Sequence, residues 1–211
     1  MLKRGDIILF QGDSITDCDR LREENRSLGQ GYANLLGSGL LCDHADLGLK
    51  VYNRGISGDT VMNMYARFEV DCYMLKPTLL SILIGVNDVW REMKVENSGI
   101  VKEKYEKVYD MLLTETAERL PQVRFVLLEP FVLQGGLVVK YQPFRESLDE
   151  RRRIVQNLAK KHGAIFVPLQ DAFDEACKIA EDTHWLYDGV HPTAAGHGLI
   201  AKNWKKAVFS L

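Results

Sequence analysis

A serine, an aspartate and a histidine are spaced along the chain in a way that suits nucleophilic catalysis. Ser14 lies in Gly12-Asp13-Ser14, where the glycine allows a tight turn beside the hydroxyl. Near the other end of the chain, Asp188 precedes His191 by three residues, so the carboxylate can accept the Nδ1 hydrogen and leave Nε2 to act as a base. A serine hydroxyl needs such a base because it is a weak nucleophile at its own pKa. The three residues therefore predict a nucleophile, a base and the carboxylate that orients the base.

Two further loops are suited to stabilise the negative charge that develops when a serine attacks a carbonyl group. They are Asn53-Arg54-Gly55-Ile56-Ser57-Gly58-Asp59 and Gly85-Val86-Asn87-Asp88. The N–H groups of Ser14 and Gly58 and the side-chain amide of Asn87 are the candidate donors, and one such donor typically contributes about 3 kcal/mol. Taken singly, Gly58 and Asn87 are more typical of ordinary turns. The prediction depends on all three donors lying at one site.

The elements that position these loops follow an alternating pattern. Buried parallel strands are expected over residues 7–10, 51–53, 79–84, 125–128 and 164–167. Helices are expected over residues 32–41, 59–68 with Asp59 as N-cap, 105–120, 148–159 and 193–208. Parallel strands need crossover helices on both faces of the sheet, so the pattern predicts one doubly wound α/β domain over residues 1–211. Ligands bind outside the carboxyl ends of such strands, which is where the polar loops stand.

Taken together, the blocks around Ser14, Gly58, Asn87 and His191 resemble the GDSL or SGNH hydrolases. All four catalytic blocks occur in the order that defines this family, and the likeness covers nearly the whole chain. The resemblance implies a three-layer α/β/α sandwich with a flavodoxin-like five-stranded parallel sheet. It also implies an acyl-serine mechanism that uses no metal or cofactor, with an oxyanion hole formed by the three donors.

Within that family, residues 8–17, 53–58 and 85–91 are most similar to the intracellular GDSL acetyl-xylan esterases, which remove acetyl groups from xylo-oligosaccharides. The resemblance implies a small ester or an acetylated oligosaccharide as substrate. The residues expected to contact it are Asp13, Trp90, Arg91 and Tyr187. Tyr187 departs from the pattern, because those esterases are expected to carry a tryptophan there. Trp90 is equally typical of a core side chain, and Arg91 of a surface ion pair.

Three other functions remain open at this point. A lysophospholipase or a thioesterase would use the same triad on a different acyl or leaving group. A non-catalytic binding subunit would keep the fold without the chemistry, since fold does not fix function. An α/β-hydrolase is disfavoured because its nucleophile lies well inside the chain, and because Asp59 replaces the second glycine that an elbow around Ser57 would need.

Composition and charge exclude several binding partners. The chain has 27 Lys and Arg against 29 Asp and Glu, a formal net charge of −2, so no basic field attracts nucleic acid or an anionic membrane. No signal peptide or membrane span is expected. The four cysteines are widely spaced, which favours reduced thiols and a cytoplasmic location.

The remaining features carry weaker expectations. The other histidines lack metal-ligand spacing and are expected at the surface or in helix caps: His44, His162, His184 and His197. Arg151-Arg152-Arg153 is expected on a solvated helix face. The segment 131–136 suits a pocket wall, a subunit contact or a plain loop. Apolar residues such as Leu137-Val138-Val139 suit a homo-oligomer contact.

Overall fold

The computed structural model describes residues 2–94, 101–138 and 140–209 of the 211-residue chain. A parallel sheet of five strands runs through this part of the chain in the order β2-β1-β3-β4-β5. The strands are β1 (Ile7–Gly12), β2 (Lys50–Asn53), β3 (Leu79–Leu83), β4 (Arg124–Leu128) and β5 (Ile165–Val167). Each lies within two residues of its predicted bounds, and the strand order is the flavodoxin-like one that the resemblance implied.

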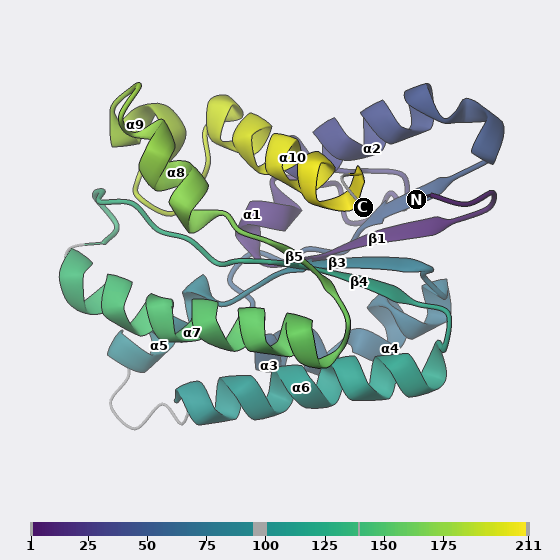
Figure 1. The fold of residues 1–211 in the computed structure, drawn as a ribbon, viewed down its shortest axis with the longest axis horizontal. Coiled ribbons are helices and arrows are strands. Elements are labelled where there is room, and N and C mark those ends of the chain that lie inside the picture. Colours follow the sequence, from purple (N-terminus) through teal and green to yellow (C-terminus); the bar gives the residue numbers. More distant parts are fainter. Residues whose placement is uncertain (1, 95–100, 139, 210–211) are drawn as a thin grey trace.

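Helices cover both faces of the sheet, so the predicted three-layer α/β/α sandwich is confirmed (Figure 1). The long helices are α2 (Tyr32–Asp43) and α10 (Ala194–Phe209) on one face, and α6 (Lys102–Arg119) and α7 (Tyr141–Lys161) on the other. Shorter helices are α1 (Ser14–Asp17), α3 (Val61–Ala66), α4 (Phe68–Asp71), α5 (Val86–Lys94), α8 (Gln170–Ala176) and α9 (Asp182–Trp185). Two 3-10 turns are η1 (Ala45–Leu47) and η2 (Tyr73–Leu75).

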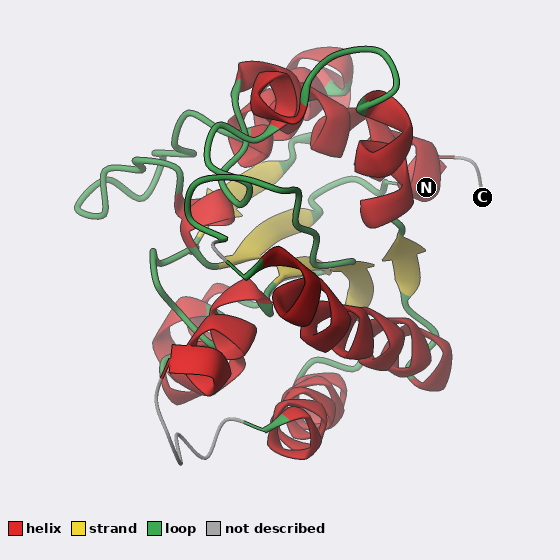
Figure 2. Cartoon of the chain, turned by 90° about the vertical axis from the view of Figure 1, so that its left-hand side faces the viewer, coloured by secondary structure: helices red, strands yellow, loops and turns green. Residues whose placement is uncertain are grey.

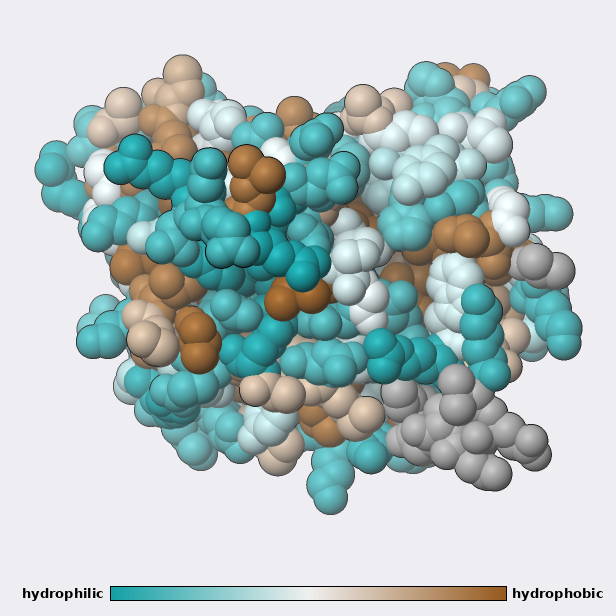
Figure 3. All heavy atoms as spheres, turned by 180° about the vertical axis from the view of Figure 1, so that it is seen from behind, coloured by the Kyte–Doolittle hydropathy of each residue, from teal (hydrophilic) through white to brown (hydrophobic). Residues whose placement is uncertain are grey.

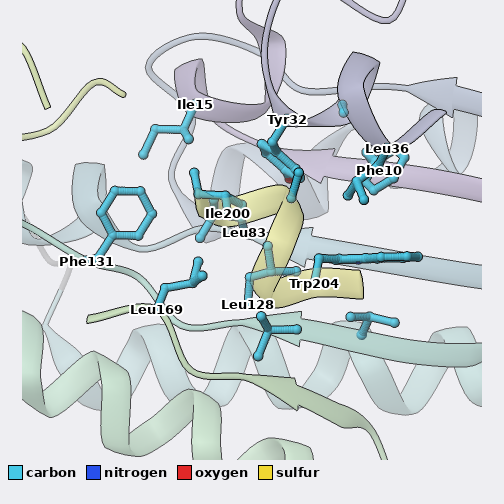
Figure 4. Packing of buried hydrophobic residues seen from close by; sticks show 14 of the residues in the cluster. Phe10, Ile15, Tyr32, Leu36, Leu83, Leu128, Phe131, Leu169, Ile200 and Trp204 are labelled. Carbon is cyan, nitrogen blue, oxygen red and sulfur yellow. The ribbon is translucent and has the colours of Figure 1, made fainter. Parts of the chain in front are cut away.

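Alternating strand residues build a separate apolar core on each face. Phe10 of β1 faces α2 and α10, where it packs against Tyr32 and Trp204 (Figure 4). Leu9, its neighbour, belongs to the cluster beneath α3, α6 and α7. Successive strand side chains point to opposite faces, so a strand covered on both sides is apolar at every position. The indole Nε1 of Trp204 donates to Ser81 Oγ at 3.0 Å, which satisfies the one polar group that this ring buries.

The predicted N-cap of one helix is wrong by one residue. Helix α3 begins at Val61, and Thr60 is its N-cap: the Thr60 hydroxyl accepts from the Asn63 N–H in a capping box. Asp59 was the predicted N-cap, but its carboxylate accepts from Arg67 Nε at 2.7 Å. The cap was misplaced because either residue suits an N-cap locally, and only the approach of Arg67 decides between them.

The predicted solvated arginine face is also wrong for its first residue. Arg151 is 1% exposed, and its Nη2 donates to Glu92 of α5 at 2.6 Å. Arg152 is half-buried and donates to Glu129 at 2.9 Å, while Arg153 is exposed. Helix α7 packs against α5 as well as the sheet, so a position that looks exposed from its charge lies between two helices.

The loops that leave the carboxyl ends of the strands gather at one end of the molecule (Figure 2). On the face opposite to that of Figure 1, hydrophobic side chains are scattered among hydrophilic ones (Figure 3). In the proposed contact loop, Leu137 is exposed and Val138 is buried, while Val139 lies outside the described residues. Among the described helices, none is long and apolar enough to cross a membrane.

Candidate active site

Ser14 begins a one-turn helix directly after β1, an inner strand of the sheet. Gly12 ends the strand with φ +156°, and a Cβ there would lie 2.2 Å from the Leu83 carbonyl oxygen, so a larger residue would separate β1 from β3. The Asp13 carboxylate accepts from the Ile15 N–H at 3.0 Å and caps the turn. The strand and its cap thus fix the backbone of Ser14 at the carboxyl end of the sheet.

Three short contacts join Ser14, His191 and Asp188. Ser14 Oγ lies 2.9 Å from His191 Nε2, and His191 Nδ1 lies 2.7 Å from Asp188 Oδ2. Asp188 Oδ1 accepts from the Val190 and His191 backbone N–H groups at 2.9 and 2.8 Å. Partial burial works to raise the pKa of Asp188, but the hydrogen bonds from His191 and Val190 outweigh it and hold that pKa below its usual value. Asp188 therefore stays ionised beside the imidazole.

The segment after β4 supports the loop that carries Asp188 and His191. The Leu133 N–H donates to the Gly189 carbonyl at 2.9 Å. Gly135 lies so close to this loop that a Cβ would be 2.3 Å from both the Asp188 carbonyl carbon and the Gly189 nitrogen. Residues 131–136 were predicted to form a pocket wall, a subunit contact or a plain loop. In the structure, this segment packs against the backbone of the loop that carries Asp188 and His191.

The loop after β2 brings Gly58 toward the Ser14 turn. The Ile56 N–H donates to the Gly12 carbonyl at 3.0 Å, so this loop continues alongside the end of β1. Gly58 has φ +84°, a left-handed conformation that favours glycine, and a Cβ there would meet nothing within 4 Å. Within the described residues, neither the Ser14 N–H nor the Gly58 N–H donates to a protein acceptor. Both donors are thus available to a ligand.

Asn87 and Arg91 both lie on α5, the helix after β3, which the sequence analysis did not predict. Asn87 Nδ2 donates to the Asp59 carbonyl at 3.1 Å, which places this side chain against the Gly58 loop. Arg91 Nη2 donates to the Gly58 carbonyl at 3.2 Å. The structure therefore ties the predicted substrate contact Arg91 to the backbone of the loop that carries Gly58.

Two acidic residues beside these blocks are buried beneath the site. Asp13 is 1% exposed, and burial raises its pKa to about 7. Asp88 accepts from the Val61 N–H at 3.1 Å, and burial raises its pKa to about 8. Asp13 was expected to contact substrate, but the structure places its carboxylate under the Ser14 turn, where it caps α1.

A cleft of about 630 Å³ opens beside Ser14. Its wall includes Ser14, His191, Tyr187, Arg22, Cys18 and His197. The Tyr187 ring is stacked on that of His191 and is 61% exposed, so it forms part of the cleft rim.

Trp90 lies elsewhere. It lines a separate apolar cavity of about 320 Å³ with Met93 and Phe144, and its ring meets that of Phe144 edge to face. Trp90 was predicted either to contact substrate or to pack in the core. The structure shows the second, since Trp90 packs against one of the two apolar clusters.

Cys18 and His197 are among the cleft-wall residues that were not predicted from the sequence. His197 is buried, and its Nδ1 accepts from the Tyr32 N–H at the start of α2, so it has the predicted helix-cap role but not a surface position. Burial lowers its pKa to about 4, which keeps the ring neutral with a hydrogen on Nε2, 3.4 Å from Cys18 Sγ. Cys18 follows Ser14 by four residues, and that spacing was the available signal.

In the described ranges, no group of three or more histidine, cysteine, aspartate or glutamate side chains is arranged to hold a metal ion. Residues 10–199 match the model of the GDSL-like Lipase/Acylhydrolase family. The chain belongs to this family. As a GDSL-like hydrolase, it acts on carboxylic esters.

Two relatives of this GDSL-like hydrolase match nearly its whole length. An acetylxylan esterase from Geobacillus stearothermophilus is 35% identical over 211 aligned residues, which cover 97% of this chain and 94% of the relative. Its crystal structure superposes with a TM-score of 0.88. A structure of a candidate GDSL-like lipase from Parabacteroides merdae is 41% identical, with a TM-score of 0.94, and covers 99% of this chain and 98% of that one.

Several solved structures are variants of the Geobacillus esterase. Catalytic mutants replace a serine, an aspartate or a histidine by alanine, and its aspartate and histidine are three residues apart. Another variant replaces the tryptophan that directly precedes the aspartate.

Proposed function

We propose that this GDSL-like hydrolase removes short acyl groups, acetyl above all, from acetylated carbohydrates through an acyl enzyme on Ser14. The chain of contacts from Ser14 Oγ through His191 to Asp188 Oδ2 carries the proposal. The same three residue types are replaced in the catalytic mutants of the Geobacillus esterase, and the aspartate-to-histidine spacing is the same in both proteins.

In the first half of the reaction, His191 Nε2 takes the Ser14 hydroxyl proton as Oγ bonds to the ester carbonyl carbon. The carbonyl oxygen becomes an oxyanion, which accepts from the Ser14 N–H, the Gly58 N–H and Asn87 Nδ2. The bond from the acyl carbon to the alcohol oxygen then breaks, and imidazolium Nε2 gives its proton to that oxygen. The acyl group stays on Ser14.

In the second half, water replaces the alcohol. His191 takes a proton from the water as its oxygen bonds to the acyl carbon, and a second oxyanion forms at the same donors. The bond to Ser14 Oγ breaks, the proton returns to that oxygen, and the free acid leaves. Asp188 remains ionised throughout and holds the hydrogen on His191 Nδ1.

The carbohydrate substrate is supported by the relatives and by the cleft. The Geobacillus esterase is described as an acetyl-xylooligosaccharide esterase. The wall of the cleft beside Ser14 includes charged and polar side chains such as Asp17, Arg22 and Gln30, with the exposed ring of Tyr187 at the rim. Polar groups suit a polyol leaving group, and an aromatic ring suits the face of a sugar. A long acyl chain would need an apolar wall.

The test compares wild type with Ser14→Ala on aryl acetate and on acetylated xylo-oligosaccharides. We expect release of acetate by wild type and a fall in kcat of about 10⁴-fold or more in the variant, because no other group supplies the nucleophile. Mass spectrometry of acid-quenched wild type should find one acetyl group on Ser14. Hydrolysis that is unaffected by Ser14→Ala would overturn the mechanism.

Two further measurements separate the alternatives. A series of aryl esters from acetate to octanoate should show the highest kcat/KM with acetate. If octanoate were hydrolysed faster, a lysophospholipase or thioesterase activity would replace the acetylesterase. Absence of hydrolysis on every ester would favour a non-catalytic binding subunit.

A further inference from the structure

Asp17 ends the same one-turn helix that Ser14 begins, yet its side chain contacts the loop after β2, which carries Gly58. Asp17 Oδ2 accepts from the Ser57 backbone N–H at 2.9 Å and from Arg22 Nη2 at 2.9 Å. The residue is 5% exposed. A buried carboxylate that is shared between a backbone N–H and a guanidinium forms charge-assisted hydrogen bonds, which are about twice as strong as neutral ones.

The two loops are in close backbone contact at this point. A Cβ on Gly55 would lie 2.3 Å from the Asp17 nitrogen. Asn53 Nδ2 donates to the Thr16 carbonyl at 2.6 Å, and Arg20 Nε donates to the Gly55 carbonyl at 2.8 Å. The end of α1 and the loop after β2 therefore form one packed unit, and Asp17 is its link to Ser57.

Three backbone groups around Gly58 are held in succession. Asp17 holds the Ser57 N–H, Arg91 holds the Gly58 carbonyl, and Asn87 holds the Asp59 carbonyl. Between them stands the Gly58 N–H, which has no protein acceptor in the described part of the chain. Gly58 has φ +84° and no Cβ, so its own conformation is permissive, and its neighbours must fix the direction of this N–H.

We infer that Asp17 is a positioning residue for oxyanion stabilisation: through the Ser57 N–H it aims the Gly58 N–H at the oxygen of the carbonyl group whose carbon Ser14 attacks. One short helix thus carries the nucleophile at its first residue and the anchor of an oxyanion donor at its last. The relative position of the nucleophile and this anchor is then set by a single helical turn. Preorganised donors of this kind lower the barrier because they need no rearrangement during the reaction. The inference rests on the proposed acyl-serine mechanism.

The experiment measures steady-state kinetics on aryl acetate for Asp17→Ala and Asp17→Asn, with active sites counted by a phosphonate that labels Ser14. Removing an oxyanion donor costs 10²- to 10³-fold, and misdirecting one should lower kcat per active site by about 10- to 100-fold in Asp17→Ala. KM should change by less than about threefold, since the donor acts on the transition state. Asp17→Asn keeps an oxygen acceptor for the Ser57 N–H and should recover most of kcat.

The affinity of a trifluoromethyl ketone is a second measurement, and it would not change if Asp17 had a merely structural role. The ketone adds to Ser14 as a hemiketal anion, so its affinity reports the oxyanion donors directly. Across wild type, Asp17→Asn and Asp17→Ala, its affinity per active site should fall by the same factor as kcat.

Asp6 provides the matched control. It is also buried, and its carboxylate likewise accepts from a backbone N–H, that of Lys3 at 2.7 Å, and from an arginine, Arg124 at 2.6 Å. It lies at the amino end of β1, away from Ser14. Asp6→Ala should lower the melting temperature but leave kcat and ketone affinity per active site unchanged.

The outcomes separate the two proposals. If Asp17→Ala loses only active-site number or thermal stability, as Asp6→Ala does, the positioning role is overturned and the acyl-serine mechanism stands. If kcat falls but ketone affinity does not, Asp17 acts elsewhere and the inference also fails. If Ser14→Ala retains activity, the mechanism itself is wrong, whatever Asp17 does.

Discussion

The phenol ring of Tyr187 is stacked on the imidazole ring of His191, with centroids 5.7 Å apart and planes 17° from parallel. The backbone reinforces this pair, since the Tyr187 N–H donates to the His191 carbonyl at 3.1 Å. One face of the His191 ring is therefore covered by an aromatic side chain that is itself largely exposed. Both rings line the cleft beside Ser14.

Replacing Tyr187 should change substrate binding more than chemistry. His191 keeps its Asp188 contact without the tyrosine, whereas an oligosaccharide loses an aromatic surface. We expect Tyr187→Ala to raise KM for acetylated xylo-oligosaccharides by about 3- to 10-fold, from an aromatic contribution of about 0.5–1.5 kcal/mol, with kcat on aryl acetate within about threefold. Tyr187→Trp should restore KM. Equal losses on both substrates would contradict a role confined to the rim.

Gly135 should tolerate no side chain. In Gly135→Ala the new Cβ would overlap the backbone of Asp188 and Gly189, so the loop that holds His191 must shift. We expect a loss of about 1–3 kcal/mol in the free energy of unfolding, as for other overpacked sites, and a lower kcat. Denaturant unfolding and aryl acetate kinetics measure the two effects. Gly136→Ala is the control, because a Cβ there meets nothing within 4 Å, and it should match wild type in both.

Arg91 should act on the rate through the Gly58 carbonyl. Since an ordinary hydrogen bond contributes about 1 kcal/mol, Arg91→Gln should lower kcat by about fivefold on aryl acetate and on oligosaccharide alike, with KM unchanged. Lys94→Gln, on the same helix but over the Trp90 ring, is the control and should have no effect. A rise in KM for oligosaccharide alone would instead make Arg91 a substrate contact, as the sequence analysis expected.

Asp88 should make the fold less stable at alkaline pH. Burial raises its pKa to about 8 in the folded chain, against 3.8 as the ordinary value, so between these values the folded state binds a proton that the unfolded state does not. The stability contributed by this group is therefore fully present below about pH 4, falls as the pH rises toward 8, and is level above.

Asp88→Asn removes this titration and keeps an oxygen acceptor for the Val61 N–H. We expect its melting temperature to exceed that of wild type by several degrees at pH 8.5, since each kcal/mol corresponds to roughly 2–4 °C for a chain of this size. At pH 5 the two proteins should melt within a degree or two of each other. Circular dichroism measures both melting temperatures from pH 5 to 9. If their difference were constant over this range, Asp88 would not titrate in it.

Features that depend on short spacings and on periodicity could be predicted from the amino-acid sequence. The five strands and the long helices follow from apolar patterns, because a strand covered on both faces must be apolar throughout. The three-residue step from Asp188 to His191 lets one loop hold both, so their pairing needs little of the remaining fold.

Features that depend on residues far apart in the chain could not be predicted in this way. Ser14 and His191 are 177 residues apart, and the parallel order of the strands brings their loops to one edge of the sheet. Asp13, Trp90 and Arg91 look alike in sequence as polar or aromatic neighbours of the catalytic blocks, but their burial and partners differ. The link between Asp17 and Ser57 also depends on two strands lying side by side. Local spacing cannot show which side chain a neighbouring loop will cover, because that depends on how the loops pack.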